Sequence, residues 1–313
     1  TFASINGTTD NLMYKMEDDY GTSYYFRGAQ SYVNNNIIFG GFQWKIIRIN
    51  GDGSLRLIYN GTEAQFNTNG TVNTTGTNAQ INTAVWNTTY DNDCKYVGYM
   101  YGGTNGTAST VRNGTTSAAA TYNQTSSNIK SVIDSWYQTN ISSQPFKSQI
   151  VDSLFCNDRQ LESEVGGTTT GPGYGYPAVT TNYAATWRLV SNNTPILKCG
   201  LKNDRFTVSD TIIGNGALTY PVGLITIDEM TLAGMRYDIY NSLNYLYTGQ
   251  NYWSMSPSDL RYESYARGFQ GNSTGDLFQS WVQSSIGVRP VISIYSQTRV
   301  TGTGTATDPY IVV

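Results

Sequence analysis

The sequence contains no histidine, the residue that most often serves as a general base or a metal ligand. This absence excludes Ser-His-Asp and Cys-His hydrolases, and it restricts any zinc site to cysteine and carboxylate ligands. The three cysteines, Cys94, Cys156 and Cys199, show no Cys-x-x-Cys spacing, so neither a zinc ribbon nor a thioredoxin-type site is predicted. We therefore expect no enzymatic activity and no cofactor.

Charge is also scarce, because charged residues make up 13% of the 313 residues, against roughly 25% in an ordinary domain. The net charge of -3 provides no basic face for nucleic acid. Solubility must instead come from Asn, Thr, Ser and Gly and from 25 tyrosines, a composition typical of secreted and cell-surface β-rich proteins. We expect an extracellular protein at the cell surface.

Long apolar runs are missing, so no membrane span is predicted in this chain. The sequence begins at Thr1 and shows no signal peptide. The simplest interpretation is a mature product whose targeting or anchoring segment has been removed.

In an extracellular protein, three cysteines suggest one disulfide and one odd thiol. We favour the pair Cys156–Cys199, because both residues flank the same loop region, but the two other pairings remain open. Cys156 as a nucleophile is disfavoured, since no histidine can activate it. The role of the odd Cys94 is left open.

The pattern of strands is clearest at residues 42–49 and 55–59, two alternating runs joined by Asn-Gly-Asp-Gly, which together predict a hairpin. The apolar segment 287–294, entered through an Arg-Pro step, and the aromatic segment 252–258 predict two late strands. We expect both late strands to pair with the hairpin and form the core. Further strands are expected at residues 24–28, 37–39, 95–101, 221–227 and 310–313.

Helices are expected at four places. The strongest is residues 126–140, with Ser127 as N-cap and apolar residues at helical spacing. Shorter helices are expected at 10–18 and 149–155, and after Thr226 or Asp228. Helices and strands together predict an α+β fold, with an antiparallel sheet, two or more helices and long polar loops.

Several side chains are candidates for chemistry, and each has a simpler structural interpretation. Asp52, Asp91 and Asp93 offer oxygen ligands to calcium, but they do not complete a calcium-binding loop, so a role in turns is favoured. Asp228 and Glu229 are a candidate catalytic pair, although adjacent residues at a helix start do not face one another, so helix capping is favoured.

The aromatic residues and the asparagines also offer binding and modification sites. Trp44, Trp253 and Trp281 are candidates for a sugar-binding face, but large aromatics beside β-branched strands more often belong to the core. Eleven Asn-x-Ser/Thr sequons are candidate glycosylation sites: Asn6, Asn60, Asn69, Asn73, Asn87, Asn105, Asn113, Asn123, Asn140, Asn192 and Asn272.

Several blocks of sequence, in this order, resemble a family of bacterial surface proteins. They are residues 42–53, the 127–137 helix, Phe155-Cys156-Asn157-Asp158, residues 222–229, Tyr252-Trp253-Ser254-Met255-Ser256-Pro257, Gly287-Val288-Arg289-Pro290-Val291 and the ending around 302–311. The resemblance implies an extracellular protein whose domain, of unknown function, has a C-type-lectin-like fold. Members of this family are often secreted or made with a prepilin-type leader, and no catalytic residues are implied.

With this resemblance, we expect three parts: an N-terminal arm with a short helix at 1–23, a single lectin-like domain at 24–300 with insertions at 60–125 and 160–185, and a C-terminal tail strand at 301–313. The expected function is that of a non-enzymatic structural subunit of a surface filament, pilus-like appendage or surface layer that self-associates into a polymer. The alternative is a lectin-like adhesin that binds glycan or host protein through loops 60–125 and 166–183.

Overall fold

The computed structural model describes residues 13–63, 76–88, 96–101, 123–167, 181–261 and 265–313, and in these residues strands dominate. The expected α+β lectin-like class is therefore wrong: the described chain is mostly β, arranged in several sheets. Its α-helices are α2 (Asn128–Asn140) and α3 (Ile227–Leu232). Short 3₁₀ or π segments lie at Thr77–Ala79, Pro145–Gln149, Glu162–Val165, Thr186–Ser191 and Lys202–Asp204.

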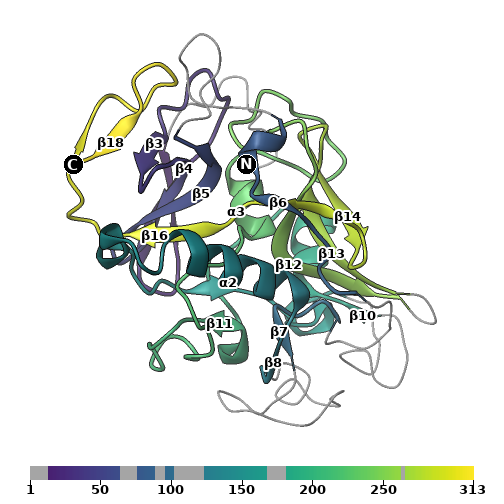
Figure 1. The fold of residues 1–313 in the computed structure, drawn as a ribbon. Helices are drawn as coiled ribbons and strands as arrows, with labels where there is room; N and C mark the ends of the chain where they lie inside the picture. Colours follow the sequence, from purple (N-terminus) through teal and green to yellow (C-terminus); the bar gives the residue numbers. More distant parts are fainter. Residues whose placement is uncertain (1–12, 64–75, 89–95, 102–122, 168–180, 262–264) are drawn as a thin grey trace.

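The first sheet has eight strands and contains the predicted hairpin. Its strands are β1 (Met13–Glu17), β2 (Thr22–Phe26), β3 (Asn36–Phe39), β4 (Phe42–Ile49), β5 (Leu55–Thr62), β16 (Val291–Ile294), β17 (Val300–Thr301) and β18 (Tyr310–Val312). β4 and β5 pair antiparallel around a turn in which Gly53 has φ +85°, a conformation that favours glycine. β16 pairs with β5, and β18 lies parallel to β3 (Figure 1).

The second sheet has six strands and is built around the aromatic strand β12. Its strands are β6 (Asn82–Ala84), β10 (Thr181–Asn182), β12 (Tyr252–Leu260), β13 (Ala266–Gly271), β14 (Leu277–Trp281) and β15 (Ile286–Val288). The expectation that both late segments pair with the hairpin is thus half wrong, since β12 belongs to the other sheet. Two small sheets pair β7 (Met100–Tyr101) with β8 (Thr125–Ser126) and β9 (Phe155–Cys156) with β11 (Arg205–Phe206).

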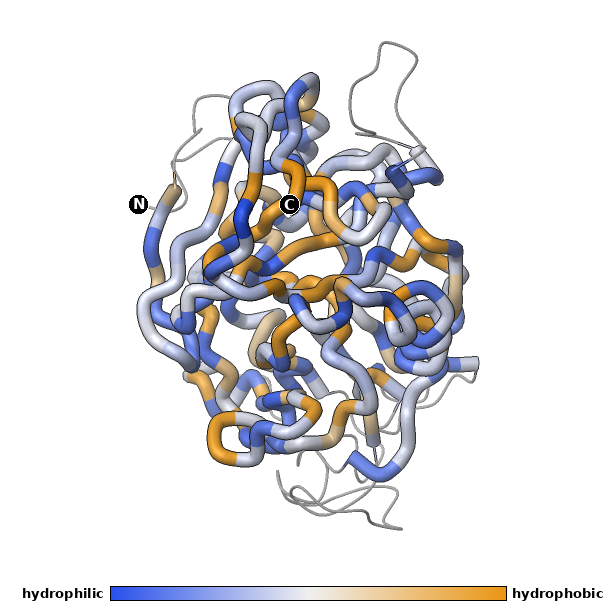
Figure 2. The backbone as a smooth tube through the Cα atoms, turned by 60° about the vertical axis from the view of Figure 1, so that its left-hand side comes forward, coloured by the Kyte–Doolittle hydropathy of each residue, from blue (hydrophilic) through white to orange (hydrophobic). Residues whose placement is uncertain are grey.

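The Arg289-Pro290 step carries the chain from β15 in the second sheet to β16 in the first. The buried Arg289 side chain donates hydrogen bonds to the carbonyls of Tyr59 and Leu246, at 3.0 and 3.1 Å. Most of the buried apolar residues form one large cluster, and a small second cluster contains Tyr25, Leu197 and Leu232. Figure 2 shows the hydrophobic segments gathered in the middle of the molecule. The sequence motif at 287–294 is therefore the link that joins the sheets over a common core.

The two described α-helices begin where the sequence predicts. The Ser127 hydroxyl accepts a hydrogen bond from the Lys130 backbone N–H, which caps α2, and Ile129, Ile133 and Tyr137 are buried. Thr226 caps α3, and Glu229 completes the capping box by accepting from the Thr226 N–H. The first turn of α3 also contains two buried carboxylates, Asp228 and Glu229.

Two expected helices are wrong. Met13–Glu17 is strand β1, whose residues alternate between exposed and partly buried positions, as the two-residue period of a strand requires. The expected helix at 149–155 is absent: a 3₁₀ turn ends at Gln149, and residues 151–154 belong to no helix or strand and lead into β9. Asp152 there accepts backbone hydrogen bonds from Val208 and Ser209, so tertiary contacts override the apolar spacing.

Of two further expected strands, one is shorter than predicted and the other is reduced to a single bridge. Of residues 95–101, only Met100–Tyr101 form a strand among those described. Within 221–227, Gly223 makes an isolated antiparallel bridge to Val291, and Ile227 already belongs to α3. The C-terminal strand is confirmed as β18, which pairs with β3 and β17 of the same chain.

Candidate functional site

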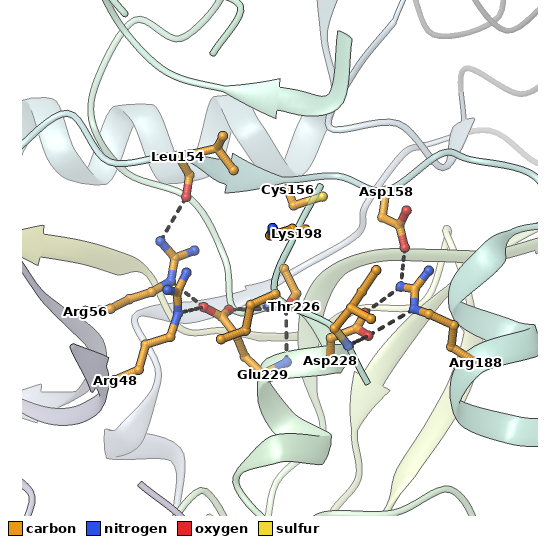
Figure 3. Close-up of a pocket in the computed structure, with 12 residues that line it drawn as sticks. Arg48, Arg56, Leu154, Cys156, Asp158, Arg188, Lys198, Thr226, Asp228 and Glu229 are labelled. Carbon is orange, nitrogen blue, oxygen red and sulfur yellow. Dashed lines mark hydrogen bonds and ion pairs between the residues drawn. The ribbon is translucent and has the colours of Figure 1, made fainter. Parts of the chain in front are cut away.

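Glu229 and Asp228, adjacent at the start of α3, point in opposite directions into two buried ion-pair groups (Figure 3). The Glu229 carboxylate contacts the Nε atoms of Arg48 and Arg56 at 2.9 and 2.6 Å. Arg48 also contacts Asp18 at 2.6 Å. This group therefore ties α3 to β4 and β5 of the first sheet.

The Asp228 carboxylate faces the other way. It contacts Arg188 Nη2 at 2.7 Å and accepts the Ile196 backbone N–H at 2.9 Å. Arg188 Nη2 also contacts Asp158 at 2.5 Å. The expectation that the two carboxylates do not face one another, and that Glu229 caps the helix, is confirmed. No catalytic dyad is formed by this pair.

The pKa values of the two carboxylates are shifted in opposite directions by their surroundings. Burial raises the pKa of Asp228, and Arg188 opposes this only in part. Burial also acts to raise the pKa of Glu229, but Arg56 and Arg48 outweigh it and leave that pKa below its ordinary value. Burial lowers the pKa of Arg56 to about 10, against the attraction of Glu229. Each carboxylate therefore depends on guanidinium partners that are fixed inside the protein.

The cavity between the two groups is small. It is lined by Arg48, Arg56, Leu154, Cys156, Asp158, Arg188, Ile196, Leu197, Lys198, Thr226, Asp228 and Glu229. Its volume for the centre of a water-sized sphere is about 20 Å³, which holds about one water molecule. Since the space is too small for an organic substrate, this cluster is a structural centre that joins α3, the 188–198 segment and the first sheet.

The predicted disulfide borders this cavity and is confirmed. Cys156 and Cys199 are joined with a Cα–Cα distance of 5.6 Å, and β9 pairs with β11 just beside the bridge. Cys94 lies outside the described residues. A disulfide of this kind is typical of proteins that fold in an oxidising environment.

Larger open space lies beside β6, the edge strand of the second sheet. One groove, of about 440 Å³, runs between β6 and the outer face of α2. It is lined by Ile81, Asn82, Ser131, Val132, Ser135, Trp136, Thr139 and Asn140. Asn82 and Thr139 are exposed, while Trp136 is half-buried and makes edge contacts with Trp44 and Tyr59.

A second groove, of about 390 Å³, lies on the other side of β6. It is lined by Gln80, Thr83, Gly249, Gln250, Asn251, Ser273, Ser285, Ile286 and Gly287. Asn82 and Thr83 are neighbours on a strand, so their side chains point to opposite sides and line different grooves. None of the described residues that line either groove is charged.

The structure also places most of the residues that the sequence offered as candidates for binding calcium or sugar. Asp52 accepts hydrogen bonds from the N–H and hydroxyl of Ser54, which is the expected turn role, while Asp91 and Asp93 lie outside the described residues. Trp44 and Trp253 are core residues, and only Trp281 of the three is substantially exposed, beside Tyr265. Among the residues described, no group of three or more acidic or cysteine side chains is placed to hold a metal ion.

The sequons divide by burial. Asn60, Asn87 and Asn123 are buried, and each side chain is hydrogen-bonded inside the protein, for example Asn123 Nδ2 to the Asn203 carbonyl at 2.7 Å. Asn192 is exposed, and Asn140 and Asn272 are half-buried. Asn6, Asn69, Asn73, Asn105 and Asn113 lie outside the described residues.

The sequence did not reveal the grooves beside β6, because their residues meet only in the fold. One signal was present: the outer face of α2 carries Ser131, Ser135 and Thr139 where most surface helices carry charges. The loops expected to bind ligands, 60–125 and 166–183, lie largely outside the described residues, although β6 and its neighbours belong to the first of them.

Comparison of the chain with models of protein families, with curated proteins and with solved structures found no match. The resemblance to bacterial surface proteins therefore stays a prediction. Among the residues that the structure describes, no helix combines the length and apolar character needed to cross a membrane.

Proposed function

We propose that this chain is a non-enzymatic extracellular protein that binds neutral glycans in the two grooves beside β6. The observation that carries this proposal is the chemistry of the described lining, in which amides and hydroxyls predominate, Trp136 supplies an aromatic surface and no described residue is charged. Sugars present hydroxyls and apolar C–H faces, which match this combination.

The location proposed is the cell surface. The Cys156–Cys199 disulfide, the low content of charged residues and the abundance of Asn, Thr and Tyr all support an extracellular environment. Neutral sugars offer no charge for a protein to attract, so the small net charge of -3 is compatible with an adhesin that binds them.

The experiment is a glycan array followed by calorimetric titration with the best neutral oligosaccharide. Asn82→Ala and Thr139→Ala remove one exposed polar group each, and each is expected to weaken binding by about 2- to 10-fold, the worth of one hydrogen bond. Thr301→Ala, on the exposed strand β17, is the matched control and should bind normally. Absence of binding to any neutral glycan, or binding unaffected by both groove variants, would contradict the proposal.

A second candidate function is that of a subunit of a surface polymer, and one observation favours it. Four apolar side chains of the C-terminal segment are 40–72% exposed: Tyr295, Val300, Ile311 and Val313. β18 pairs within its own chain, so the contact would involve these side chains and not an exchanged strand.

Sedimentation over a range of concentrations tests this second candidate. Ile311→Lys is expected to abolish self-association, whereas Ile212→Lys, at a more exposed apolar position elsewhere, is expected to leave it unchanged. A wild-type chain that remains monomeric at every concentration would rule the polymer out.

A further inference from the structure

Lys45, in the middle of β4, is a buried lysine whose contacts are unusual. Its side chain is 1% exposed, and Nζ donates a hydrogen bond to Asn36 Oδ1 at 2.6 Å. In the described part of the chain, no carboxylate forms an ion pair with it. Burial, with a smaller effect from Arg289, lowers the pKa of Lys45 to about 7, so much of the amine is neutral near physiological pH.

Asn36, on β3, is placed opposite Lys45 and held in one orientation. The two residues are paired in the antiparallel register of β3 and β4, so their side chains share one face of the sheet. The Asn36 Nδ2 atom donates to the Gly304 carbonyl at 2.9 Å, and its own backbone N–H donates to the same oxygen at 3.0 Å. Asn36 is itself 2% exposed, so the amine and the carboxamide meet away from bulk water.

We propose that Lys45 and Asn36 react to form an intramolecular isopeptide bond. The neutral Lys45 Nζ attacks Asn36 Cγ and forms a C–N bond; the Cγ–Nδ2 bond breaks, and a proton from Nζ passes to Nδ2, which leaves as ammonia. The exchange consumes no oxidant, reductant or other reactant. The product is an amide that links β3 covalently to β4.

Three features of the site promote this reaction. The fixed contact between amine and carboxamide replaces a bimolecular encounter. The desolvated site and the nearby positive charge of Arg289 both disfavour the ammonium form, which cannot act as a nucleophile. Finally, the product is a neutral amide, whereas the buried amine it replaces can carry a positive charge and has no carboxylate partner among the described residues, so the reaction removes an unfavourable burial of charge. Release of ammonia to solvent then makes the bond permanent.

The bond would also affect a strand other than β3 and β4. β3 pairs with β4 on one side and with the C-terminal strand β18 on the other (Figure 1). Asn36 also holds Gly304, in the segment that leads to β18, through two hydrogen bonds. A covalent link at Asn36 therefore fixes the strand on which the C-terminal segment depends.

Mass spectrometry of the complete, denatured chain tests the proposal. After allowance for the disulfide, the wild-type protein should be lighter than its sequence by one molecule of ammonia. Trypsin should no longer cut after the acylated Lys45, so residues 28–48 should appear as one peptide with the same loss. Chymotryptic cleavage between Asn36 and Lys45 should then leave two pieces that are joined through these two side chains.

Lys45→Met is the matched control, because it keeps a long apolar side chain but removes the nucleophile. Loss of ammonia from an Asn-Gly succinimide, for which Asn50-Gly51 is one candidate, has the same mass but does not require Lys45. A mass deficit that disappears in Lys45→Met supports the cross-link, and one that persists contradicts it. Should the variant not fold, the wild-type peptide map decides alone: a peptide of residues 28–45 at its full mass, with no linked product, overturns the proposal.

Discussion

At the scale of single residues, the most consequential buried group is the Glu229 carboxylate. It is 3% exposed and is held by two guanidinium groups from neighbouring strands, Arg48 on β4 and Arg56 on β5. Its other oxygen accepts the Thr226 N–H. One side chain thus completes a helix cap and balances the charge of two buried arginines.

Glu229→Gln should therefore destabilise the protein strongly, although the side chain keeps its size. We expect a loss of about 3–5 kcal/mol in the free energy of unfolding, because the buried guanidinium of Arg56 loses the carboxylate it contacts and that of Arg48 keeps one carboxylate contact, with Asp18. Urea denaturation measures the loss. Glu63→Gln, at an exposed position, should change the stability by less than about 0.5 kcal/mol. Equal effects for the two variants would contradict this account of the cluster.

The same carboxylate should leave a signature in the pH dependence of stability. Because the folded pKa of Glu229 lies below its ordinary value of 4.5, its ionised form stabilises the fold fully above that value. The contribution is lost as the pH falls through the folded pKa. The stability difference between wild type and Glu229→Gln should thus be constant near neutrality and shrink below pH 4.5. Denaturation curves at several pH values test this, and a difference that does not shrink in acid would refute it.

At the scale of elements, α2 depends on the Ser127 hydroxyl at its N-terminus. This group accepts the Lys130 N–H at 3.2 Å and donates to the Tyr99 carbonyl at 2.8 Å, so it joins the helix to the end of the segment before β7. Ser127 is fully buried. Its removal therefore affects both the helix cap and a buried carbonyl.

Ser127→Ala is expected to cost about 1–2 kcal/mol, the usual value for an N-cap together with a lost buried hydrogen bond. Ser135→Ala in the same helix is the control. Ser135 is exposed, and alanine has a higher helix propensity, so this variant should be neutral or stabilised by a few tenths of a kcal/mol. Urea midpoints of the two variants give the comparison, and the cap assignment fails if Ser127→Ala is as stable as Ser135→Ala.

Elements with strong local signals were predictable from the sequence. The β4–β5 hairpin carries its own turn residues, and α2 has both an N-cap and an apolar face. The helix predicted at residues 10–18 was wrong at residues 13–17. So short a stretch fits the period of a helix or that of a strand, and its pairing with β2 makes it a strand. The assignment of β12 and β16 to different sheets also depends on tertiary pairing, which a local pattern does not encode.

At the scale of the whole molecule, the candidate sites were only partly predictable. The disulfide could be anticipated because Cys156 and Cys199 flank one loop region, and the structure confirms it. The grooves beside β6 could not, because Asn82 and Thr139 are brought together by the packing of α2 on an edge strand. The ion pairs of Glu229 likewise link residues more than a hundred positions apart in sequence.

The fold as a whole also determines which asparagines a glycosylating host can modify. A glycan attached to Nδ2 needs solvent around that atom, and Asn87 lacks it because its Nδ2 donates to the Tyr96 carbonyl at 2.9 Å inside the protein. Asn192, by contrast, is exposed, and its bond to the Trp187 carbonyl can be replaced by water. Burial, and not the three-residue motif, should therefore set the occupancy.

We expect folded protein secreted by such a host to carry glycan on Asn192 and none on Asn60, Asn87 or Asn123. Peptide mapping before and after enzymatic deglycosylation measures the occupancy of each sequon. Asn192→Gln should lower the glycan mass without affecting stability, whereas Asn87→Gln should leave the glycan mass unchanged and lower the unfolding free energy by about 1–3 kcal/mol, since it disrupts buried hydrogen bonds. Glycan on Asn87 in the folded protein would contradict this, because that side chain cannot hold a sugar and its internal partners together.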